Sequence, residues 1–398
     1  MLSKLFEMAI LRRFAADFIT SDLQFGFKKK LSCNHAIYSI RNVVDHYIRQ
    51  ESTVNLCMID LCKAFDKMNH HALFLKLLNR RFPIQLINIF VLWFNISATC
   101  IKWGGCLSHF FKLRSGVRQG GVLSPYFFAI FIDDVINEVA TSKTGCHISS
   151  SSVAIFVYAD DIVLVAPSVQ SLQDLLSLVE GPLEDLDMRI NATKSQCIRF
   201  GHRHDAECAN LTARNGDIIS WVKTCRYLGA YFVSGRTFKC SFDNAKRQFY
   251  GSFNAVYSKL GRFASEEVVL SLVRSKCLPT LLYAVESCPM NIRDKRSLEF
   301  TVNRILMKLF RTGSMSVIEE CQRFFGFLPT KLLLDIKIAK FLQKFLASEN
   351  QICRLFYNQA DRQLGDIRRA YQLSSDSTAC KISSEIQNRF FQFESMLI

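Results

Sequence analysis

The chain of 398 residues is 49% hydrophobic and contains 34 Phe, a composition that excludes an intrinsically disordered tail. The length is sufficient for two or three domain-sized units, each with its own core. The formal net charge is +15, and residues 222–344 alone hold 21 Lys and Arg against nine Asp and Glu. Apolar periodicity continues through that region, so we predict folded helices with a basic face suited to a polyanion, either nucleic acid or a membrane surface.

The sequence gives no sign of a secreted or membrane-spanning protein. None of the 15 cysteines is spaced as CxxC, and the N-terminal MLSKLFEMAILRRF has the pattern of an amphipathic helix, not of a signal peptide. Reduced thiols in an intracellular protein fit this pattern best. The longest apolar window, residues 86–101, contains Asn88 and Asn95 and is too short to cross a bilayer. No membrane partner is therefore expected.

The first elements in chain order are two helices and a strand. Residues 1–17 and 34–50 are expected to form amphipathic helices, joined by the basic link GFKKKLS at 26–32. The next segment, residues 52–60, is apolar and β-rich, which predicts a strand that ends at Asp60.

A second helical region follows. Residues 70–80 carry leucines at helical spacing, and Pro83 ends or closely follows this helix. The segment RSGVRQGGVLSP, residues 114–125, is a glycine-marked loop that leads into another helix. Ser124 is predicted as its N-cap and Pro125 as its first helical residue.

An acidic hairpin comes next, in the segment AIFVYADDIVLVA (154–166). Two apolar strands meet at a tip that carries Asp160 and Asp161. Ionised carboxylates beside such apolar neighbours are costly unless a cation compensates them. If this hairpin lies next to the strand that ends at Asp60, three carboxylates converge. Oxygen ligands with open water positions favour Mg²⁺ or Mn²⁺, and two such ions support phosphoryl transfer.

The remaining elements complete an α+β pattern. A helix is expected at 169–188 with a break at Gly181-Pro182, followed by a strand at 195–200. A short strand pair is predicted at 225–232, and from Ser241 onward one helix follows another.

Ordered segments of the chain resemble the reverse transcriptases encoded by animal non-LTR (LINE-type) retrotransposons. MIDLCKAFDKMNHHAL, GVRQGGVLSPYFFAIFIDD and FVYADDIVLVA are similar to motifs A, B and C of that family. QFGFKKKLSCNHAI is similar to its fingers segment, MRINATKSQCIRF to its motif D and CRYLGAYF to its primer grip. The helices beyond about residue 235 resemble the thumb, including LPTLLYAVES at 278–287. The resemblance implies an RNA-directed DNA polymerase, which is a nucleotidyltransferase.

The resemblance also assigns the catalytic residues. Asp60, Asp160 and Asp161 would be the ligands of two Mg²⁺ or Mn²⁺ ions, and Leu61 would lend a backbone oxygen. Phe65 would lie under the sugar of the incoming nucleotide, where its ring would clash with a 2′-hydroxyl and so select dNTPs. Plain core packing is the alternative interpretation of Phe65.

Further residues are implied to contact substrates. Gln119 and Gly120 would lie beside the nascent base pair, the glycine allowing close backbone approach. Lys194 would approach the triphosphate, although a solvated surface position is the usual setting of a single lysine. Tyr158 and Ala159 would flank the primer terminus.

Nucleic-acid contacts are expected from the C-terminal half as well. Leu228 and Gly229 fall in the segment similar to the primer grip. The basic helices after residue 240 would hold the backbone of the template–primer hybrid, through contacts that weaken with salt and carry little sequence specificity.

Two features depart from the family pattern. Family members usually carry Gly where this chain has Lys30 and Arg where it has Leu31, so fingers contacts are expected to differ. The chain also begins at a point that resembles the middle of the family's fingers. Without a recognisable endonuclease domain or Cys/His knuckle, it is interpreted as truncated at the N-terminus.

The predicted fold is an α+β right-hand polymerase, with a palm built on an antiparallel sheet of about four strands and helical fingers and thumb. The predicted parts are partial fingers at 1–51 and 69–114, a palm with the catalytic site at 52–68 and 115–235, a thumb at 236–345, and a C-terminal helical segment of unknown role at 346–398.

Alternative functions stay open at this point. A catalytically impaired nucleic-acid-binding remnant would keep the same fold and the same aspartates. An RNA-directed RNA polymerase or a group II intron maturase shares a palm with paired aspartates, but RQGGVLSP and Phe65 favour the DNA-making type. The expected partners are an RNA template, a DNA primer or target, and dNTPs, and family analogy implies a nuclear location. The sequence makes no prediction of the oligomeric state.

Overall fold

The computed structural model describes residues 2–260 and 263–391, which belong to two compact units. Unit 1 comprises Met1–Ala36 and His46–Lys223, and unit 2 comprises Ile37–Asp45 and Thr224–Ile398. Met1 of the predicted first helix, residues 261–262 of the predicted thumb and residues 392–398 of the predicted C-terminal segment lie outside the described residues. The predicted palm residues 224–235 fall in unit 2 with the predicted thumb. The division into fingers, palm and thumb stays a prediction.

A mixed sheet forms the centre of unit 1. Among the described residues of this unit, six strands lie in the order β11-β12-β10-β1-β9-β8. Their bounds are β1 Val54–Ile59, β8 Ile155–Tyr158, β9 Asp161–Ala166, β10 Gln196–Phe200, β11 Leu211–Thr212 and β12 Ile218–Trp221. The four strands β10-β1-β9-β8 are antiparallel, as predicted. The prediction missed β12, which pairs in parallel with β10. Parallel strands need a crossover, and residues 201–217 carry the chain back to the end of the sheet at which β10 begins.

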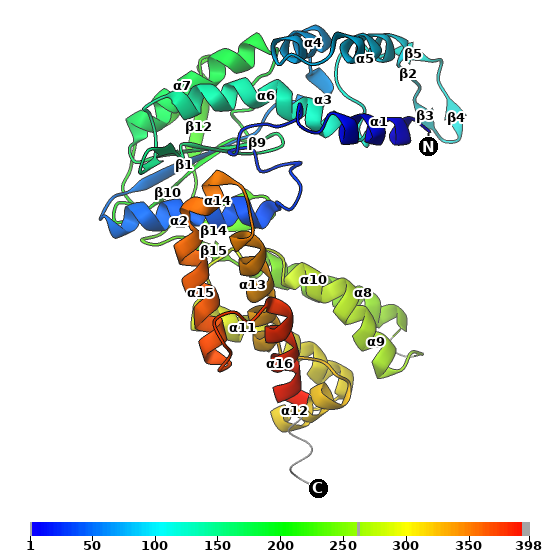
Figure 1. The fold of residues 1–398 in the computed structure, drawn as a ribbon. Helices are drawn as coiled ribbons and strands as arrows, with labels where there is room; N and C mark the ends of the chain where they lie inside the picture. Colours follow the sequence, from blue (N-terminus) through cyan, green and yellow to red (C-terminus); the bar gives the residue numbers. More distant parts are fainter. Residues whose placement is uncertain (1, 261–262, 392–398) are drawn as a thin grey trace. The chain divides into compact units, whose positions relative to one another are not determined.

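The apolar runs of the sequence explain why these strands lie at the centre. Every residue of β1 is buried, so the strand shows a continuous apolar run and no inside–outside alternation. Helices α6 (Ser124–Thr141) and α7 (Val169–Asp185) lie side by side over one face of the sheet (Figure 1). Leu172, Leu175 and Leu176 of α7 are fully buried.

Helix α7 corrects one prediction. The expected break at Gly181-Pro182 does not occur, because α7 continues through Pro182 to Asp185. A tertiary contact supports the helix at this point. The Arg214 guanidinium lies against Gly181, and its Nη2 donates to the Ser177 carbonyl at 3.1 Å. A Cβ at position 181 would lie 3.2 Å from Arg214 Nη2, so the glycine leaves space for that contact.

The other elements of unit 1 surround this sheet. The helices are α1 Leu2–Arg13, α2 Cys33–Arg49, α3 Ala64–Lys67, α4 His70–Asn79 and α5 Ile84–Ile96. Short strands form two-stranded ribbons that the sequence analysis did not predict: β2 Ala98–Thr99 with β5 Phe111–Lys112, β3 Lys102–Trp103 with β4 Cys106–Leu107, and β6 His147–Ile148 with β7 Ser151–Ser152.

Unit 2 combines a small sheet with a helical array. Its described strands, β13 Thr224–Tyr227, β14 Ala230–Val233 and β15 Lys239–Ser241, form an antiparallel sheet. The helices that follow are α8 Asp243–Leu260, α9 Glu266–Leu272, the π-helical segment η1 Val273–Cys277, α10 Leu278–Leu281, α11 Ile292–Phe310, α12 Met315–Phe324, α13 Thr330–Leu346, α14 Gln351–Leu355, α15 Tyr357–Ala370 and α16 Ala379–Phe391. Helices α15 and α16 pack on α13. Tyr38 packs on Phe341 and Phe345 with ring centroids 5.4 and 4.7 Å apart, which places an α2 residue in this core.

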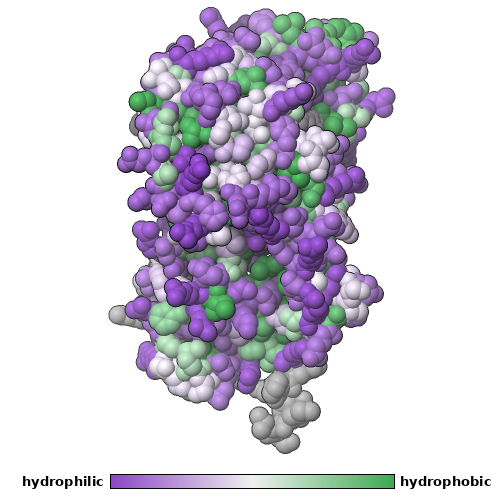
Figure 2. All heavy atoms as spheres, turned by 90° about the vertical axis from the view of Figure 1, so that its left-hand side faces the viewer, coloured by the Kyte–Doolittle hydropathy of each residue, from purple (hydrophilic) through white to green (hydrophobic). Residues whose placement is uncertain are grey.

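The surface is mainly polar on the face drawn in Figure 2. Hydrophilic residues predominate there, and hydrophobic residues occur in small scattered groups. Within residues 2–260 and 263–391, no helix has the length and apolar character needed to span a bilayer.

Candidate active site

The three predicted aspartates lie at one end of the neighbouring strands β1 and β9. The register pairs Ile59 with Ile162, so Asp60, which directly follows β1, comes beside Asp161 at the start of β9. Asp160 occupies the turn between β8 and β9, where Tyr158 pairs with Asp161. The sheet therefore gathers at one edge carboxylates that are 100 positions apart in the sequence.

The electrostatics of this edge disfavour an ionised Asp160. Burial raises the pKa of the Asp160 carboxyl, a backbone hydrogen bond lowers it, and the charge of Asp60 raises it again. A basic side chain lies near Asp60: Lys194 Nζ is 4.0 Å from Asp60 Oδ2, with the lysine side chain 70% exposed. Such an exposed pair contributes little. The edge thus carries negative charge that a bound cation would stabilise.

The donor chemistry suits a hard divalent cation, but the ligands are not preassembled. Among the described residues, no three Asp, Glu, His or Cys side chains are grouped closely enough to hold a metal ion. The interaction between Asp60 and Asp160 nevertheless shows two carboxylates near each other. Carboxylate and backbone carbonyl oxygens, including that of Leu61, are the ligand type that Mg²⁺ and Mn²⁺ prefer.

Loop geometry fixes the turn that carries Asp60. The Asp60 N–H donates to Ser195 Oγ at 3.1 Å, and the Asp60 carbonyl accepts from the Asn191 N–H at 2.8 Å. Leu61 forms a β-bridge with Ile190, the segment predicted from its resemblance to motif D. Lys194 approaches Asp60 because it lies in the same tight turn as Asn191 and Ser195.

Phe65 lies in α3, which follows Asp60 in the sequence, and is half-buried. Its ring stacks on Phe128 of α6, with centroids 4.2 Å apart and an interplanar angle of 22°. Phe27 meets it edge-on at 6.3 Å. These two rings fix the orientation of Phe65, and part of its surface stays open to solvent.

The loop with Gln119 and Gly120 precedes α6, and both residues are exposed. Gly120 has φ = +81°, a conformation that favours glycine. The loop is tied to the aromatic cluster because the Val117 N–H donates to the Phe65 carbonyl at 3.0 Å. A Cβ at Gly116 would lie 2.6 Å from the Asp66 carbonyl oxygen, so only a glycine permits this approach.

A residue that the sequence analysis missed anchors this loop. Glu7 of α1 is buried, and its Oε2 accepts from the N–H groups of Val122 and Leu123, the latter at 2.9 Å. The predicted N-cap at Ser124 is wrong: Ser124 is the first helical residue, and its hydroxyl donates to the Arg118 carbonyl at 2.7 Å. The Glu7 carboxylate accepts from the two N–H groups that directly precede the helix, so it fixes the chain at the entrance to α6.

Glu7 gives a first testable prediction. Replacing Glu7 by alanine is expected to lower the free energy of unfolding by about 1–3 kcal/mol, because the N–H groups of Val122 and Leu123 lose their side-chain acceptor. Denaturant unfolding measures the change. Glu138→Ala, at an exposed position near the other end of α6, is the matched control and is expected to shift it by less than about 0.5 kcal/mol. Equal losses in the two variants would contradict the anchoring role.

The remaining predicted residues of the hairpin and of the primer-grip segment lie in different units. Tyr158 and Ala159 are in unit 1, where Ala159 is buried with φ = +60° at the hairpin tip. Leu228 and Gly229 are in unit 2, in the turn between β13 and β14, with φ of +45° and +81°.

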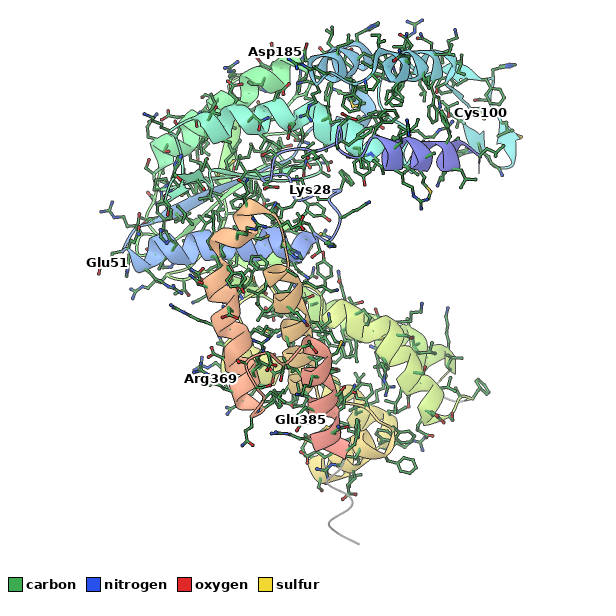
Figure 3. All side chains as sticks on the ribbon, in the orientation of Figure 1. Lys28, Glu51, Cys100, Asp185, Arg369 and Glu385 are labelled. Carbon is green, nitrogen blue, oxygen red and sulfur yellow. The ribbon has the colours of Figure 1, made fainter. Side chains whose placement is uncertain are left out.

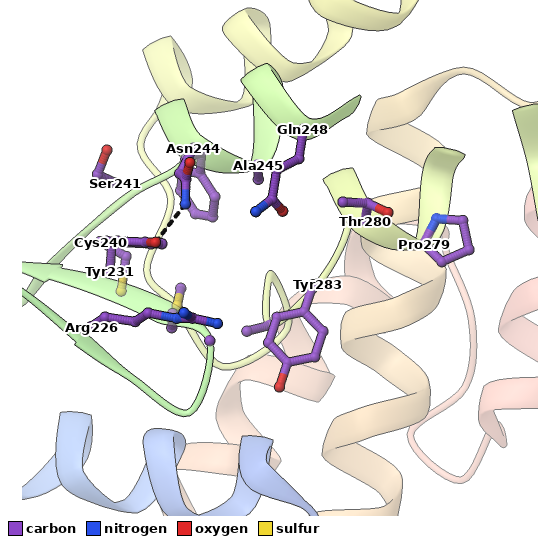
Figure 4. A pocket seen from close by; sticks show the side chains of 15 residues that line it. Arg226, Tyr231, Cys240, Ser241, Asn244, Ala245, Gln248, Pro279, Thr280 and Tyr283 are labelled. Carbon is purple, nitrogen blue, oxygen red and sulfur yellow. Dashed lines mark hydrogen bonds between the residues drawn. The ribbon is translucent and has the colours of Figure 1, made fainter. Parts of the chain in front are cut away.

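This turn borders a pocket of about 520 Å³ within unit 2. The Tyr283 hydroxyl donates to the Leu228 carbonyl at 2.9 Å, and a Cβ at Gly229 would lie 2.8 Å from the Tyr283 ring. Figure 4 shows Arg226 and Gln248 extending into the pocket from β13 and α8, with Tyr283 alongside. The pocket therefore offers polar groups beside the turn that contains Leu228 and Gly229.

The strand ends with Asp60, Asp160 and Asp161 and the glycine loop before α6 lie in the part of the chain that matches a family model. The chain belongs to the reverse transcriptase (RNA-dependent DNA polymerase) family, whose model matches residues 1–232. Both the predicted family and the predicted α+β polymerase class are thereby confirmed.

Curated proteins similar to this chain include polymerases of animal transposable elements. The RNA-directed DNA polymerase from mobile element jockey of Drosophila funebris is 27% identical over 303 residues, 72% of this chain and 32% of that protein. The Pol polyprotein from the type-1 retrotransposable element R2 of Popillia japonica is 27% identical over 281 residues, 66% of this chain and 38% of that protein. The chain thus spans about a third of the length of these relatives.

Among solved structures, telomerase from Candida tropicalis in complex with a fragment of telomeric RNA is similar to this chain at 13% identity. The match has a TM-score of 0.42 and covers 89% of this chain and 52% of that one.

Proposed function

We propose that the chain is an RNA-directed DNA polymerase that extends a DNA primer on an RNA template with dNTPs. The observation that carries the proposal is the position of Asp60, Asp160 and Asp161 at one end of adjacent strands, with Asp60 and Asp160 close enough for their charges to interact. The direct test is primer extension on an RNA template, with loss of the product in an aspartate variant.

Two divalent ions, Mg²⁺ or Mn²⁺, are the cofactors of this proposal. When bound, they would activate the primer 3′-hydroxyl and stabilise the pyrophosphate leaving group. Asp60, Asp160 and Asp161 would hold them, with the Leu61 carbonyl as a further oxygen ligand. Because these side chains are not preassembled, ion binding would draw them together against the repulsion between Asp60 and Asp160.

The nucleotide would bind between the aspartates and the loop before α6. Phe65, fixed by Phe128 and Phe27, would lie under the sugar and exclude a 2′-hydroxyl. Gln119 and Gly120 are exposed on that loop and would lie beside the new base pair. Lys194 is mostly exposed near Asp60 and would meet the triphosphate.

Unit 2 would hold the template–primer hybrid. Lys308 Nζ of α11 lies 5.0 Å from the Tyr257 ring centroid and 5.8 Å from that of Phe253, both on α8. Phe253, Lys308 and Arg304 line a hollow of about 400 Å³. Cationic and aromatic groups together suit a sugar–phosphate backbone, and such binding weakens with salt.

A metal-binding experiment gives the second prediction. Mg²⁺ at about 100 times its dissociation constant is expected to raise the melting temperature of the wild-type chain by about 3–5 °C, because the ion binds the folded state and relieves the charge at Asp160. Scanning calorimetry with and without Mg²⁺ measures the shift. Asp160→Asn is expected to lose most of it, whereas the exposed control Asp174→Asn keeps it. An equal shift in both variants would place the ion elsewhere.

A catalytically impaired nucleic-acid-binding protein of the same family is the second candidate. The observation that favours it is that no three potential metal-ligating side chains are grouped in the described part of the chain. Such a protein would bind a hybrid in a salt-sensitive manner without extending the primer.

A further inference from the structure

The tip of the acidic hairpin is held by a segment distant in sequence, residues 20–28. The Val157 N–H of β8 donates to the Leu23 carbonyl at 2.9 Å, and the Phe25 N–H donates to the Val157 carbonyl at 2.8 Å. Gln24 and Val157 form a parallel bridge. The segment thus runs alongside β8 up to the turn that carries Asp160.

Gln24 makes the contact at the turn itself. Its side chain is fully buried, and its Oε1 accepts two backbone N–H groups, from Gly26 at 2.9 Å and from Ala159 at 3.2 Å. Ala159 directly precedes Asp160 and has φ = +60°, a conformation that is costly for a residue other than glycine. The Gln24 oxygen therefore accepts a hydrogen bond from the residue with positive φ in the turn that carries Asp160.

Gly26 shows how closely the two segments approach. A Cβ at this position would lie 2.5 Å from the Ala159 nitrogen and 3.2 Å from the Tyr158 carbonyl carbon. Both contacts are with backbone, which cannot move aside as a flexible side chain does. Gln24 thus supplies the acceptor oxygen, and Gly26, two residues later, leaves the space that lets this segment approach the turn.

The segment that presents Gln24 is anchored on both sides of it. The side chain of Lys28 is labelled in Figure 3. Its Nζ donates to the carbonyls of Thr20 and Ser21 at 2.9 and 2.7 Å. The Ser21 N–H donates to Asp133 Oδ1 of α6 at 2.8 Å. These bonds close the segment into a compact loop, so the position of Gln24 beside the turn is fixed.

The amide nitrogen of Gln24, unlike its oxygen, makes no hydrogen bond in the described part of the chain. Within the described residues, Gln24 Nε2 is buried and has no hydrogen-bond partner. An unsatisfied buried donor destabilises a fold, whereas the acceptor oxygen is fully used. The hydrogen bonds of the Gln24 side chain are thus made by its oxygen alone. A variant that changes only the nitrogen can therefore be compared with one that removes the oxygen.

We propose that Gln24 is a positioning residue for the acidic hairpin: through Ala159 it fixes the turn that orients Asp160 and Asp161 towards Asp60. The inference rests on the proposed function, because it assumes that these aspartates bind divalent metal. Gln24 touches neither substrate nor metal in this account and acts through the backbone of the turn. A residue that orients ligands in this way typically affects metal affinity or activity by about 10–100-fold.

The test compares Gln24→Met, which has similar length but no acceptor, with Gln24→Glu, which keeps an acceptor oxygen and removes the unpaired amide. Exposed Gln85→Met is the matched control. Three quantities are measured: Mn²⁺ affinity of the free protein by electron paramagnetic resonance, deuterium uptake of the peptide that contains Ala159, and kcat and hybrid Kd in primer extension.

For Gln24→Met we expect faster exchange at Ala159, weaker Mn²⁺ binding and a kcat lower by about 10–100-fold, with hybrid Kd and the unfolding midpoint close to wild type. Gln24→Glu is expected to recover the slow exchange at Ala159, because a carboxyl oxygen can accept the same N–H, and Gln85→Met is expected to show no loss. Wild-type Mn²⁺ affinity and kcat in Gln24→Met would overturn the inference. So would a loss of activity matched by a loss of hybrid binding and cooperative unfolding, since that is a purely structural role.

The metal-binding arm separates this inference from the proposed function. If the wild-type chain binds Mn²⁺ but does not extend a primer, polymerase activity fails, and the Mn²⁺ affinities of the Gln24 variants still decide the positioning role. If the wild-type chain binds no Mn²⁺, there is no metal site to position and both fail.

Discussion

Replacing Asp160 by asparagine is expected to lower the rate of primer extension at least about 10³-fold, because the substitution removes a metal ligand that acts directly in phosphoryl transfer. The change is nearly isosteric, and burial with the nearby Asp60 already disfavours the charge of Asp160. Asparagine therefore removes a repulsive interaction, and the fold is expected to be as stable as wild type or more stable in the absence of metal. Single-turnover extension with saturating dNTPs measures the chemical step.

The binding measurement makes this result specific. Affinity for an RNA–DNA hybrid is expected to stay within about twofold of wild type or to increase, because that affinity depends on phosphate contacts and a negative charge is lost. Asp174→Asn, exposed on α7, is the control and is expected to extend at the wild-type rate. Extension by Asp160→Asn at a rate comparable to the control would remove Asp160 from the catalytic set.

Replacing Phe65 by valine is expected to reduce the preference for dNTPs over ribonucleotides by about 10–100-fold, because a smaller side chain leaves room for the 2′-hydroxyl. The ring is suited to exclusion, since Phe128 stacks on it at 4.2 Å and prevents it from turning aside. Competition between a dNTP and the matching ribonucleotide measures the ratio of kcat/KM values. The cost in the free energy of unfolding is expected to be about 1–2 kcal/mol, because Phe65 is only half-buried.

Phe94→Val is the matched control for this experiment. Phe94 is also a half-buried ring in an aromatic cluster, with His70 at 4.4 Å and Phe74 at 5.7 Å, and it lies on α5. A similar loss of stability without a change in sugar preference is expected there. An unchanged preference for dNTPs over ribonucleotides in Phe65→Val would contradict the role in sugar selection and would leave Phe65 as a packing residue.

Strands and acidic tips were predictable because their signals are local. The apolar run before Asp60 and the two runs around Asp160 and Asp161 have the length and composition of buried strands, and the register of β1 with β9 brings their ends together. The loop at 114–125 was predictable for the same reason, because its glycines mark a turn, and Gly120 there has φ = +81°.

Polar residues that act over long sequence distances were not predictable. Glu7 caps backbone groups 115 and 116 positions away, and Gln24 bonds to a residue 135 positions away. Neither carries a periodic pattern, and both lie in segments that the sequence analysis assigned to a helix and to the fingers. The glycine two residues after Gln24 was the available signal, because it marks a close backbone approach.

The predictions of two helix ends were wrong where a hydrogen bond from outside the helix replaced the local rule. Ser124 followed by Pro125 has the pattern of an N-cap and first helical residue, yet the helix begins at Ser124, whose hydroxyl donates to the Arg118 carbonyl. Pro182 has the pattern of a helix end, yet α7 continues to Asp185 with Arg214 against Gly181. Local propensity is a weak prior when another segment supplies the missing partner.

The measurement that tests the central claim most directly is extension of a labelled DNA primer on an RNA template by the wild-type chain, with dNTPs and Mg²⁺ or Mn²⁺. The account predicts template-directed products that disappear without divalent metal and in Asp160→Asn. Salt-sensitive binding of the hybrid without any extension, under both metals, would contradict it and would identify the chain as a nucleic-acid-binding member of the family.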